Sequence, residues 1–183
     1  DLISGNLSAN TTNSYIFTLT NGVTLVFDTQ LDCPLNWSLQ GPSGLVVNQR
    51  PFNSSDSVNG QPTLQLPAGG YQLRVAGNSS SAYKFRLLDL AAATPLTLGT
   101  PVSGPLNPGN STLTYRFTIN APQKVYYNNQ VWTGLNYTQV RLLDPFGNMV
   151  INTAFYSDQG PVMLNQPGAY TLLVEGSVGE TSN

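Results

Sequence analysis

The sequence predicts an all-β protein made of two jelly-roll-type β-sandwich modules in tandem. Three observations support this prediction. Apolar residues alternate with polar ones in short runs, Gly, Pro and Asn separate these runs, and one pattern occurs twice along the chain. None of the runs has the period of an amphipathic helix. We therefore expect a protein whose function is carried by sheets and the loops between them.

The alternating runs of the first repeat predict half-buried strands. In one of them Tyr71, Leu73 and Val75 alternate with more polar residues, as on a strand with one face toward a core. Trp37 alternates in the same way with its neighbours, so we expect it in the core. Gly and Asn tolerate a positive φ and Pro presets a turn, so the phrases between the runs are expected to be turns. The runs lie at 14–19, 37–40, 71–76 and 83–87, and the turn phrases are "TNG", "GPSG", "PAGG" and "AGNSSS".

The second repeat follows the first at an offset of 99 to 103 residues. Four matches occur in the same order, which indicates tandem modules. They pair "ISGNL" (3–7) with "VSGPL" (102–106), "SYIFTL" (14–19) with "TYRFTI" (114–119), "WSLQGPSGLVVN" (37–48) with "VRLLDPFGNMVIN" (140–152), and "PAGGYQLRVAG" (67–77) with "QPGAYTLLVEG" (166–176). We expect domains at 1–92 and 93–183, joined by a short linker at about 90–101 in which prolines and small residues interrupt the strand pattern.

The two repeats differ at their ends. The first closes with "SAYKFRLLDL" at 81–90, whereas the second stops at "VEGSVGETSN" with no closing strand. We therefore expect the second module to lack its last strand and the chain to be a piece of a longer array. An edge left unpaired in this way needs a cover, which the N-terminal residues or a neighbouring molecule would supply.

Charge and composition exclude several classes of function. Seven basic and nine acidic residues give a net charge of -2, and no basic cluster is present, so nucleic acid is not an expected partner. Asn, Gln, Ser and Thr supply most of the polarity, which favours a secreted or cell-surface β protein. Cys33 is the single cysteine and has no internal disulfide partner. No apolar run reaches the roughly 20 residues that cross a bilayer, so membrane insertion is not expected.

The inventory of side chains argues against an enzyme. The chain has no histidine, so Ser-His-Asp and Cys-His sites are excluded. Lys84 and Lys124 have no activating neighbour in the sequence, and Cys33 has no base beside it. We expect no catalytic residues.

Calcium is the one cofactor that the sequence leaves open, since the chain offers oxygen ligands in loops. Asp28 and Asp32 are expected to follow a strand four residues apart, and Asp56 lies in a loop that corresponds to the one holding Asp158. These acids could share a site if their loops meet at one end of the sandwich. The alternative is that they cap turns, because no D-x-D-x-D-G loop is present. Asp144 in "DPFG" is interpreted as a turn residue.

A binding site for polysaccharide or for a matrix protein would use exposed rings beside amide groups. Trp132, in the Asn- and Gln-rich stretch "NNQVWTGLNY", is the best single candidate. Tyr126, Tyr137 and Tyr156 are further candidates, in or near loops. The alternative is that these rings pack under loops or against the other module.

The repeated phrases resemble the bacterial pre-peptidase C-terminal domain. The resemblance rests on "Y-x-F" early in each repeat, a "P-x-G" turn in the middle and "P-A-G-G-Y-x-L-x-V" near the end. It implies secreted, non-catalytic jelly-roll sandwiches, found beside the catalytic domains of exported proteases or strung along large surface proteins, and similar to collagen-binding modules of clostridial collagenases. Members often carry an Asp-rich phrase where this chain has "CPLNWSL" (33–39) and "NYTQVRL" (136–142).

The function expected from the sequence is that of a non-catalytic tandem repeat segment of a large secreted or surface bacterial protein. It would act as a spacer, as a presentation segment or in adhesion, with neighbouring repeats of the same chain as partners. A carbohydrate- or matrix-binding module, or a targeting domain of a secreted peptidase, is the alternative.

Overall fold

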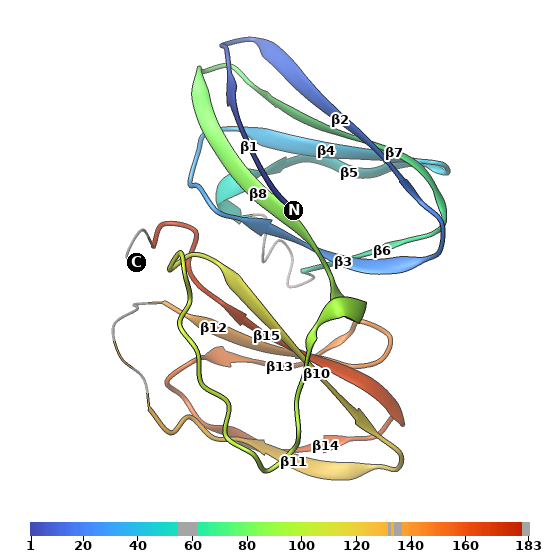
Figure 1. Cartoon of the computed structure of the whole chain (residues 1–183), viewed down its shortest axis with the longest axis vertical. Helices are drawn as coiled ribbons and strands as arrows, with labels where there is room; N and C mark the ends of the chain where they lie inside the picture. The colour runs from blue at the N-terminus through green and yellow to red at the C-terminus, as the bar shows by residue number, and fades with distance from the viewer. Residues whose placement is uncertain (55–61, 132, 134–136, 181–183) are drawn as a thin grey trace. The chain divides into compact units, whose positions relative to one another are not determined.

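The protein is almost entirely β in its computed structural model, which describes residues 1–54, 62–131, 133 and 137–180 (Figure 1). The chain divides into two compact units, Asp1–Ala91 and Ala92–Asn183. In the described part the only helical elements are short 3-10 turns, η1 (Phe52–Ser54) and η3 (Leu90–Ala92). None of the described residues forms a helix long and apolar enough to cross a membrane.

The first unit is a sandwich of two four-stranded antiparallel sheets. One sheet has the order β1-β8-β3-β6 and the other has the order β2-β7-β4-β5, which is the strand order of a jelly roll. The strands are β1 (Leu2–Leu7), β2 (Thr11–Leu19), β3 (Val23–Thr29), β4 (Asn36–Gly41), β5 (Gly44–Pro51), β6 (Thr63–Leu66), β7 (Gly69–Gly77) and β8 (Ser81–Asp89).

Large apolar side chains from both sheets fill the space between them. Phe27 of β3 stacks on Trp37 of β4 with ring centroids 4.0 Å apart, and this contact joins the two sheets. Phe27 also stacks on Phe85 of β8 at 4.8 Å. Trp37 is fully buried, which confirms its predicted place in the core. Burial of such rings contributes much of the stabilisation of a small sandwich.

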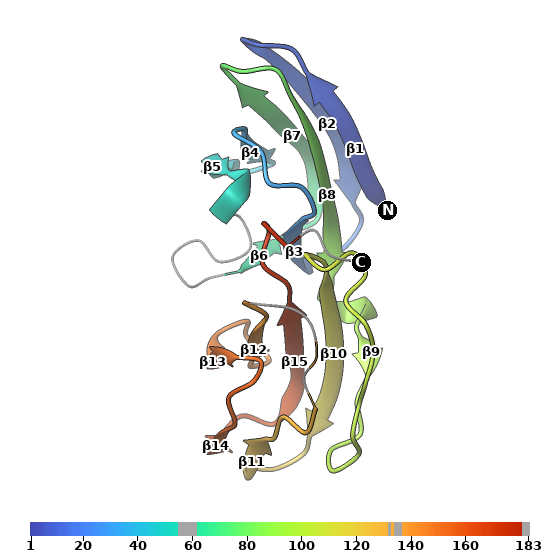
Figure 2. The ribbon, with the colours of Figure 1, turned by 90° about the vertical axis from the view of Figure 1, so that its left-hand side faces the viewer.

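The second unit repeats most of this scheme. Its large sheet has the order β13-β12-β15-β10-β9, and β11 pairs with β14 in a separate two-stranded sheet. Figure 2 shows β10, β15, β12 and β13 side by side and β9 along the outer edge of β10. The strands are β9 (Thr94–Pro95), β10 (Thr112–Ile119), β11 (Gln123–Tyr127), β12 (Gln139–Leu143), β13 (Met149–Ala154), β14 (Gln159–Leu164) and β15 (Gly168–Glu175).

Strand register shows that the repeated sequence folds twice in the same way. Phe17 lies opposite Tyr71 in the β2–β7 pair, and Phe117 lies opposite Tyr170 in the β10–β15 pair. The rings stack at 5.3 Å and 5.6 Å respectively. By this correspondence β10, β11, β12, β13, β14 and β15 are the counterparts of β2, β3, β4, β5, β6 and β7.

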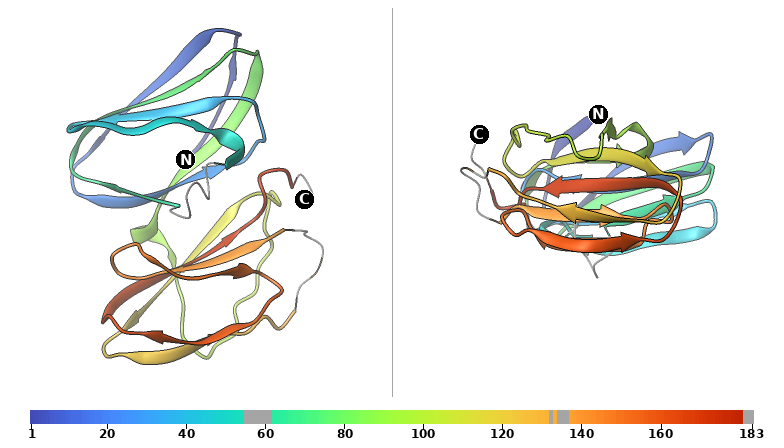
Figure 3. Two further views of the ribbon diagram at one scale, coloured as in Figure 1. Left: turned by 180° about the vertical axis from the view of Figure 1, so that it is seen from behind. Right: turned by 90° about the horizontal axis from the view of Figure 1, so that it is seen from below.

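The second unit has no counterpart of β8 among its described residues. The counterpart of β1 is also missing, because residues 102–106 do not form the strand that their match to 3–7 predicts. The physical reason lies in the first unit, where β1 pairs with β8 alone. A β1-like segment has no ladder to join when β8 is absent. Figure 3 shows the strands of both units from two further sides.

The predicted linker contains a short strand that sequence analysis did not anticipate. Thr94 and Pro95 of β9 pair in parallel with Tyr115 and Arg116 of β10, and the Leu96 amide donates a hydrogen bond to the Arg116 carbonyl oxygen at 2.7 Å. The middle of the β10 edge is thereby paired.

Candidate functional site

A groove of about 550 Å³ lies over the outer face of the β2-β7-β4-β5 sheet in the first unit. Its floor is formed by the side chains that alternate with the core residues of these strands. Cross-strand pairing places Arg74 beside Ser38 and Gln72 beside Gln40. The same ladder places Ala76 beside Asn36 at the end of the groove. The sheet therefore presents its polar positions as ordered rows.

The groove is lined by hydrogen-bonding groups and one cation. Arg74 Nε donates a hydrogen bond to Gln72 Oε1 at 3.1 Å, which fixes the guanidinium over the sheet. Ser38 Oγ accepts a hydrogen bond from the Gln49 amide at 3.0 Å. Amides and hydroxyls can both donate and accept, so the lining matches a ligand with many hydroxyl or amide groups. No aromatic side chain is among the lining residues of the described chain.

The sequence analysis did not predict this groove, because it considered only aromatic side chains and carboxylates as binding groups. The signal was present in the alternation itself, since Ser38, Gln40, Gln72 and Arg74 occupy the outward positions of two strands. Only the register between β4 and β7 shows that they lie side by side.

The same face differs in the second unit. Arg141 and Leu173 take the places of Ser38 and Arg74, as the β12–β15 register shows. Leu173 and Leu143 on this face are buried, and so is Arg141, which pairs with Glu175. The polar groove is therefore a property of the first unit in the described part of the chain.

The predicted aromatic residues lie in the second unit. Tyr126, Tyr137 and Tyr156 are all exposed, and Tyr137 has a φ of 68°. The Tyr126 hydroxyl donates to Asp158 Oδ2 at 3.3 Å, and the Asp158 carboxylate raises the pKa of Tyr126. Within the described residues, the rings of these three tyrosines make no contact with one another. Trp132 lies outside the described residues, so its role stays a prediction.

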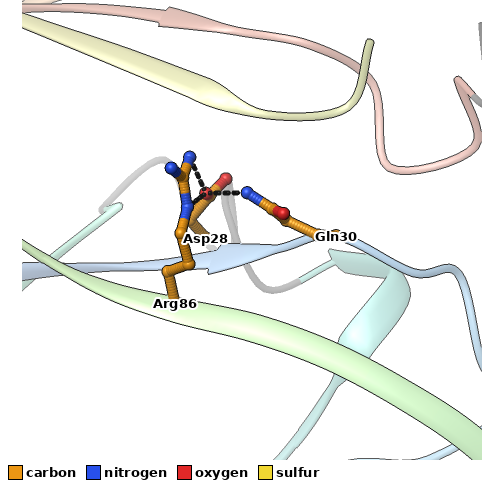
Figure 4. Close-up of polar contacts among 3 residues, drawn as sticks. All are labelled: Asp28, Gln30 and Arg86. Carbon is orange, nitrogen blue, oxygen red and sulfur yellow. Dashed lines mark hydrogen bonds and ion pairs between the residues drawn. The ribbon is translucent and has the colours of Figure 1, made fainter. Parts of the chain in front are cut away.

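Asp28 does not follow a strand as predicted, because β3 extends through it to Thr29. Its side chain is fully buried and its Oδ2 atom accepts three contacts (Figure 4). Arg86 contributes Nη2 at 2.5 Å and Nε at 2.7 Å, and Gln30 contributes Nε2 at 2.9 Å. The carboxylate is therefore engaged by a guanidinium, and a calcium ion would have to displace that cation.

The structure does not bring the other acids proposed for calcium together with Asp28 among the described residues. Asp32 is exposed, and Asp56 lies outside the described residues. Among the described residues no group of three or more Asp, Glu, Cys or His side chains could hold a metal. Asp144 accepts hydrogen bonds from the amides of Phe146 and Asn148, both at 2.8 Å, which confirms its role in a turn.

The structure also places the cysteine and the two lysines that the sequence analysis considered as reactive groups. Cys33 is buried in the loop before β4, and burial raises the pKa of its thiol. Lys84 and Lys124 are exposed on strands. A thiol with a raised pKa is a poor nucleophile at neutral pH.

Comparison with models of known protein families finds no family that matches this chain. A search of curated proteins also finds no match.

Proposed function

We propose that the chain is a non-catalytic pair of β-sandwich repeats from an exported protein, and that it serves as a spacer or presentation segment. The observation that carries the proposal is the repetition of one strand scheme and one register in both units. Each unit also has its own apolar core. Repeated self-contained units extend a protein without requiring a ligand.

Composition supports the same role. The chain has few charges and no histidine, and its polarity comes mainly from amides and hydroxyls. Such a surface limits electrostatic attraction to other macromolecules. Export, a bacterial source and kinship with the pre-peptidase C-terminal domain remain proposals that rest on the sequence resemblance.

The spacer proposal is tested by joining two and then three copies of residues 1–183 and measuring the maximum dimension by small-angle X-ray scattering. A spacer gives a constant increase in length for each added copy. A maximum dimension that stays nearly constant as copies are added would contradict it.

A second candidate function is binding of a polysaccharide in the groove of the first unit. The specific observation in its favour is the row of Gln40, Gln72 and Arg74 on one open sheet face. These side chains can bond to sugar hydroxyls, and Arg74 adds a positive charge for an acidic sugar.

Groove binding is tested by titrating a panel of neutral and acidic oligosaccharides into the protein by calorimetry. We expect Arg74→Ala to weaken a groove ligand about tenfold, which is about 1.4 kcal/mol. Lys84→Ala is the matched control, because it removes the same charge from the other sheet. Loss of binding in Trp132→Ala with Arg74→Ala unchanged would instead assign the ligand to the second unit.

A further inference from the structure

Exposed tyrosines lie at the end of the second unit where β11 and β13 end and β12 and β14 begin (Figure 1). Tyr126 belongs to β11, Tyr137 precedes β12 and Tyr156 follows β13. Their exposed fractions are 56%, 83% and 62% respectively. A single exposed ring is ordinary on a protein surface, whereas several at one end of a sandwich indicate a surface that contacts a ligand.

Hydrogen bonds join the segments that carry these tyrosines. The Phe155 amide donates to the Thr138 carbonyl oxygen at 2.8 Å, and Tyr137 and Tyr156 directly flank these two residues. The hydroxyl group of the third tyrosine donates to Asp158 Oδ2, in the turn between β13 and β14, at 3.3 Å. The three rings are therefore carried by one connected set of segments.

The first unit forms the same backbone frame without these rings. Its Phe52 amide donates to the Leu35 carbonyl oxygen at 3.0 Å, at the positions that match Phe155 and Thr138. The β4–β5 and β12–β13 pairs also have the same register next to this bond. The fold therefore does not require the tyrosines. In the first unit the places of Tyr126, Tyr137 and Tyr156 are taken by Val26, Pro34 and Asn53.

Tyr126 is held in one orientation. Its hydroxyl group is bonded to Asp158, and its Cδ2 atom lies beside Gly160, where an added Cβ would come within 3.2 Å of it. Gly160 has a φ of 127°, so both the backbone and the ring favour glycine at this position. A ring that is already ordered loses little conformational entropy when a ligand binds.

Tyr137 is exposed on a strained backbone. Its φ of 68° lies in the left-handed region, which is unusual for a bulky residue. Its ring is mostly exposed, so packing of the ring does not offset this strain. Strained residues of this kind occur mainly at functional sites.

Asp158 supplies hydrogen-bond acceptors beside the rings. Its Oδ1 atom accepts from the Asn129 amide at 2.8 Å, and its Oδ2 atom accepts from Tyr126. A carboxylate has about four lone-pair sites, so acceptor capacity remains for the hydroxyl groups of a ligand. Gln130 and Gln159, which are exposed in the adjoining segments, add amide groups.

We propose that Tyr126, Tyr137, Tyr156 and Asp158 form a binding site for a neutral polysaccharide, which we call the tyrosine site. The C–H face of a sugar ring stacks on an aromatic face, and its hydroxyl groups bond to Asp158 and the exposed amides. Because the three rings do not contact one another, each binds a separate sugar unit of an extended chain. Lys124 lies on the same face of β11 as Tyr126 and balances the charge of Asp158, which favours a neutral chain.

The test uses the full chain, labelled with ¹⁵N, and hexasaccharides of cellulose, mannan and chitin as neutral probes. We expect saturable binding of at least one of them, with chemical-shift changes at Tyr126, Asn129 and Tyr156 and none in β4 and β7. A hexasaccharide of polygalacturonate, the acidic probe, should not shift these three amides. Failure of every neutral probe, or binding of a collagen-type peptide in place of all of them, would overturn the proposal.

Substitutions then locate the site. Tyr126→Ala and Tyr156→Ala should each weaken the neutral probe at least tenfold. Phe146→Ala is the matched control, because Phe146 is a 61% exposed ring in the turn at the opposite end of the β12–β13 hairpin. Unchanged binding in both tyrosine variants, or an equal loss in Phe146→Ala, would overturn the proposal.

Tyr137→Gly separates binding from packing. Glycine adopts a φ of 68° without strain, so the midpoint of thermal unfolding should stay the same or rise, while the probe binds at least tenfold more weakly. A lower midpoint with unchanged binding would assign the ring to packing and overturn the proposal. This variant also serves if Tyr126→Ala does not fold.

Arg74→Ala distinguishes the tyrosine site from the groove of the first unit. The neutral probe should bind this variant as tightly as the parent protein. Binding that is lost in Arg74→Ala and kept in Tyr126→Ala would place the ligand in the groove and overturn the proposal. The tyrosine site does not depend on the spacer role, so failure of the length test leaves this test unchanged.

Discussion

Gly5 of β1 lies directly against the hydroxyl group of Tyr83 of β8, such that a Cβ on Gly5 would come within 2.5 Å of the hydroxyl oxygen. The same hydroxyl accepts a hydrogen bond from Asn13 Nδ2 at 2.8 Å and shares one with the Tyr15 hydroxyl at 2.5 Å. One tyrosine therefore links β1, β2 and β8. The "SG" phrase, repeated in both modules, is explained by this contact in the first unit.

Gly5→Ala should destabilise the first unit, because the new methyl group collides with the Tyr83 ring. We expect a loss of about 1 to 3 kcal/mol in the free energy of unfolding, as for overpacking of a core. Urea unfolding measures this loss. Gly104→Ala is the control and should change the free energy little, since its Cβ has open space. Equal losses in the two variants would show that the glycines have the same role.

The buried ion pair between Asp28 and Arg86 should be asymmetric in its response to substitution. Arg86→Leu leaves the fully buried Asp28 carboxylate without its cation and should cost about 3 kcal/mol. Asp28→Asn keeps a hydrogen-bonding group beside Gln30 and Arg86, whose side chain is 29% exposed, and should cost less. Urea unfolding of both variants measures the two losses in the free energy of unfolding. A larger loss for Asp28→Asn than for Arg86→Leu would contradict this account.

Stability of the first unit should fall at alkaline pH. Burial, with the hydrogen bond to Tyr83, raises the pKa of Tyr15 above its ordinary value of 10.0. The folded state therefore holds the phenolic proton more tightly than the unfolded state. The resulting stabilisation is fully present below pH 10 and is lost as pH rises toward the folded-state pKa. The urea concentration at the midpoint of unfolding, measured between pH 8 and pH 11.5, should decline less steeply with pH in Tyr15→Phe than in the parent protein. Parallel declines in the two proteins would remove Tyr15 as the cause.

The Cys33 thiol should react slowly in the folded protein. Burial raises its pKa, so little thiolate is present at neutral pH, and its side chain is 5% exposed. Labelling with a thiol reagent should be slow in buffer and rapid in denaturing urea. Rapid labelling in buffer would mean that the loop before β4 opens readily.

The alternation of apolar and polar residues predicted the strands that have one buried and one exposed face. The run of Tyr71, Leu73 and Val75 forms the inner face of β7, and Phe17 and Phe117 occupy equivalent places 100 residues apart. Such strands can be read from the sequence because the side-chain period of a strand is two.

Features that depend on distant pairing could not be read in this way. Residues 26–29 of β3 are buried on both faces, so alternation is hidden, and Asp28 finds Arg86 58 residues along the chain. The phrase at 102–106 matches the sequence of β1, but among the described residues it has no counterpart of β8 to pair with. The groove needs the register that sets Ser38 beside Arg74.

The central claim is that the two units share one fold and that, among the described residues, β11 of the second unit is paired on one side whereas β3 of the first is paired on both. Residue-resolved hydrogen exchange of the amides in β3 and β11 tests it most directly. We expect the amides of Val26 to Asp28 to exchange only through extensive unfolding, whereas alternate amides of β11 exchange through local opening. Equal protection along both strands would contradict the claim, because it would mean that the edge of β11 is already paired.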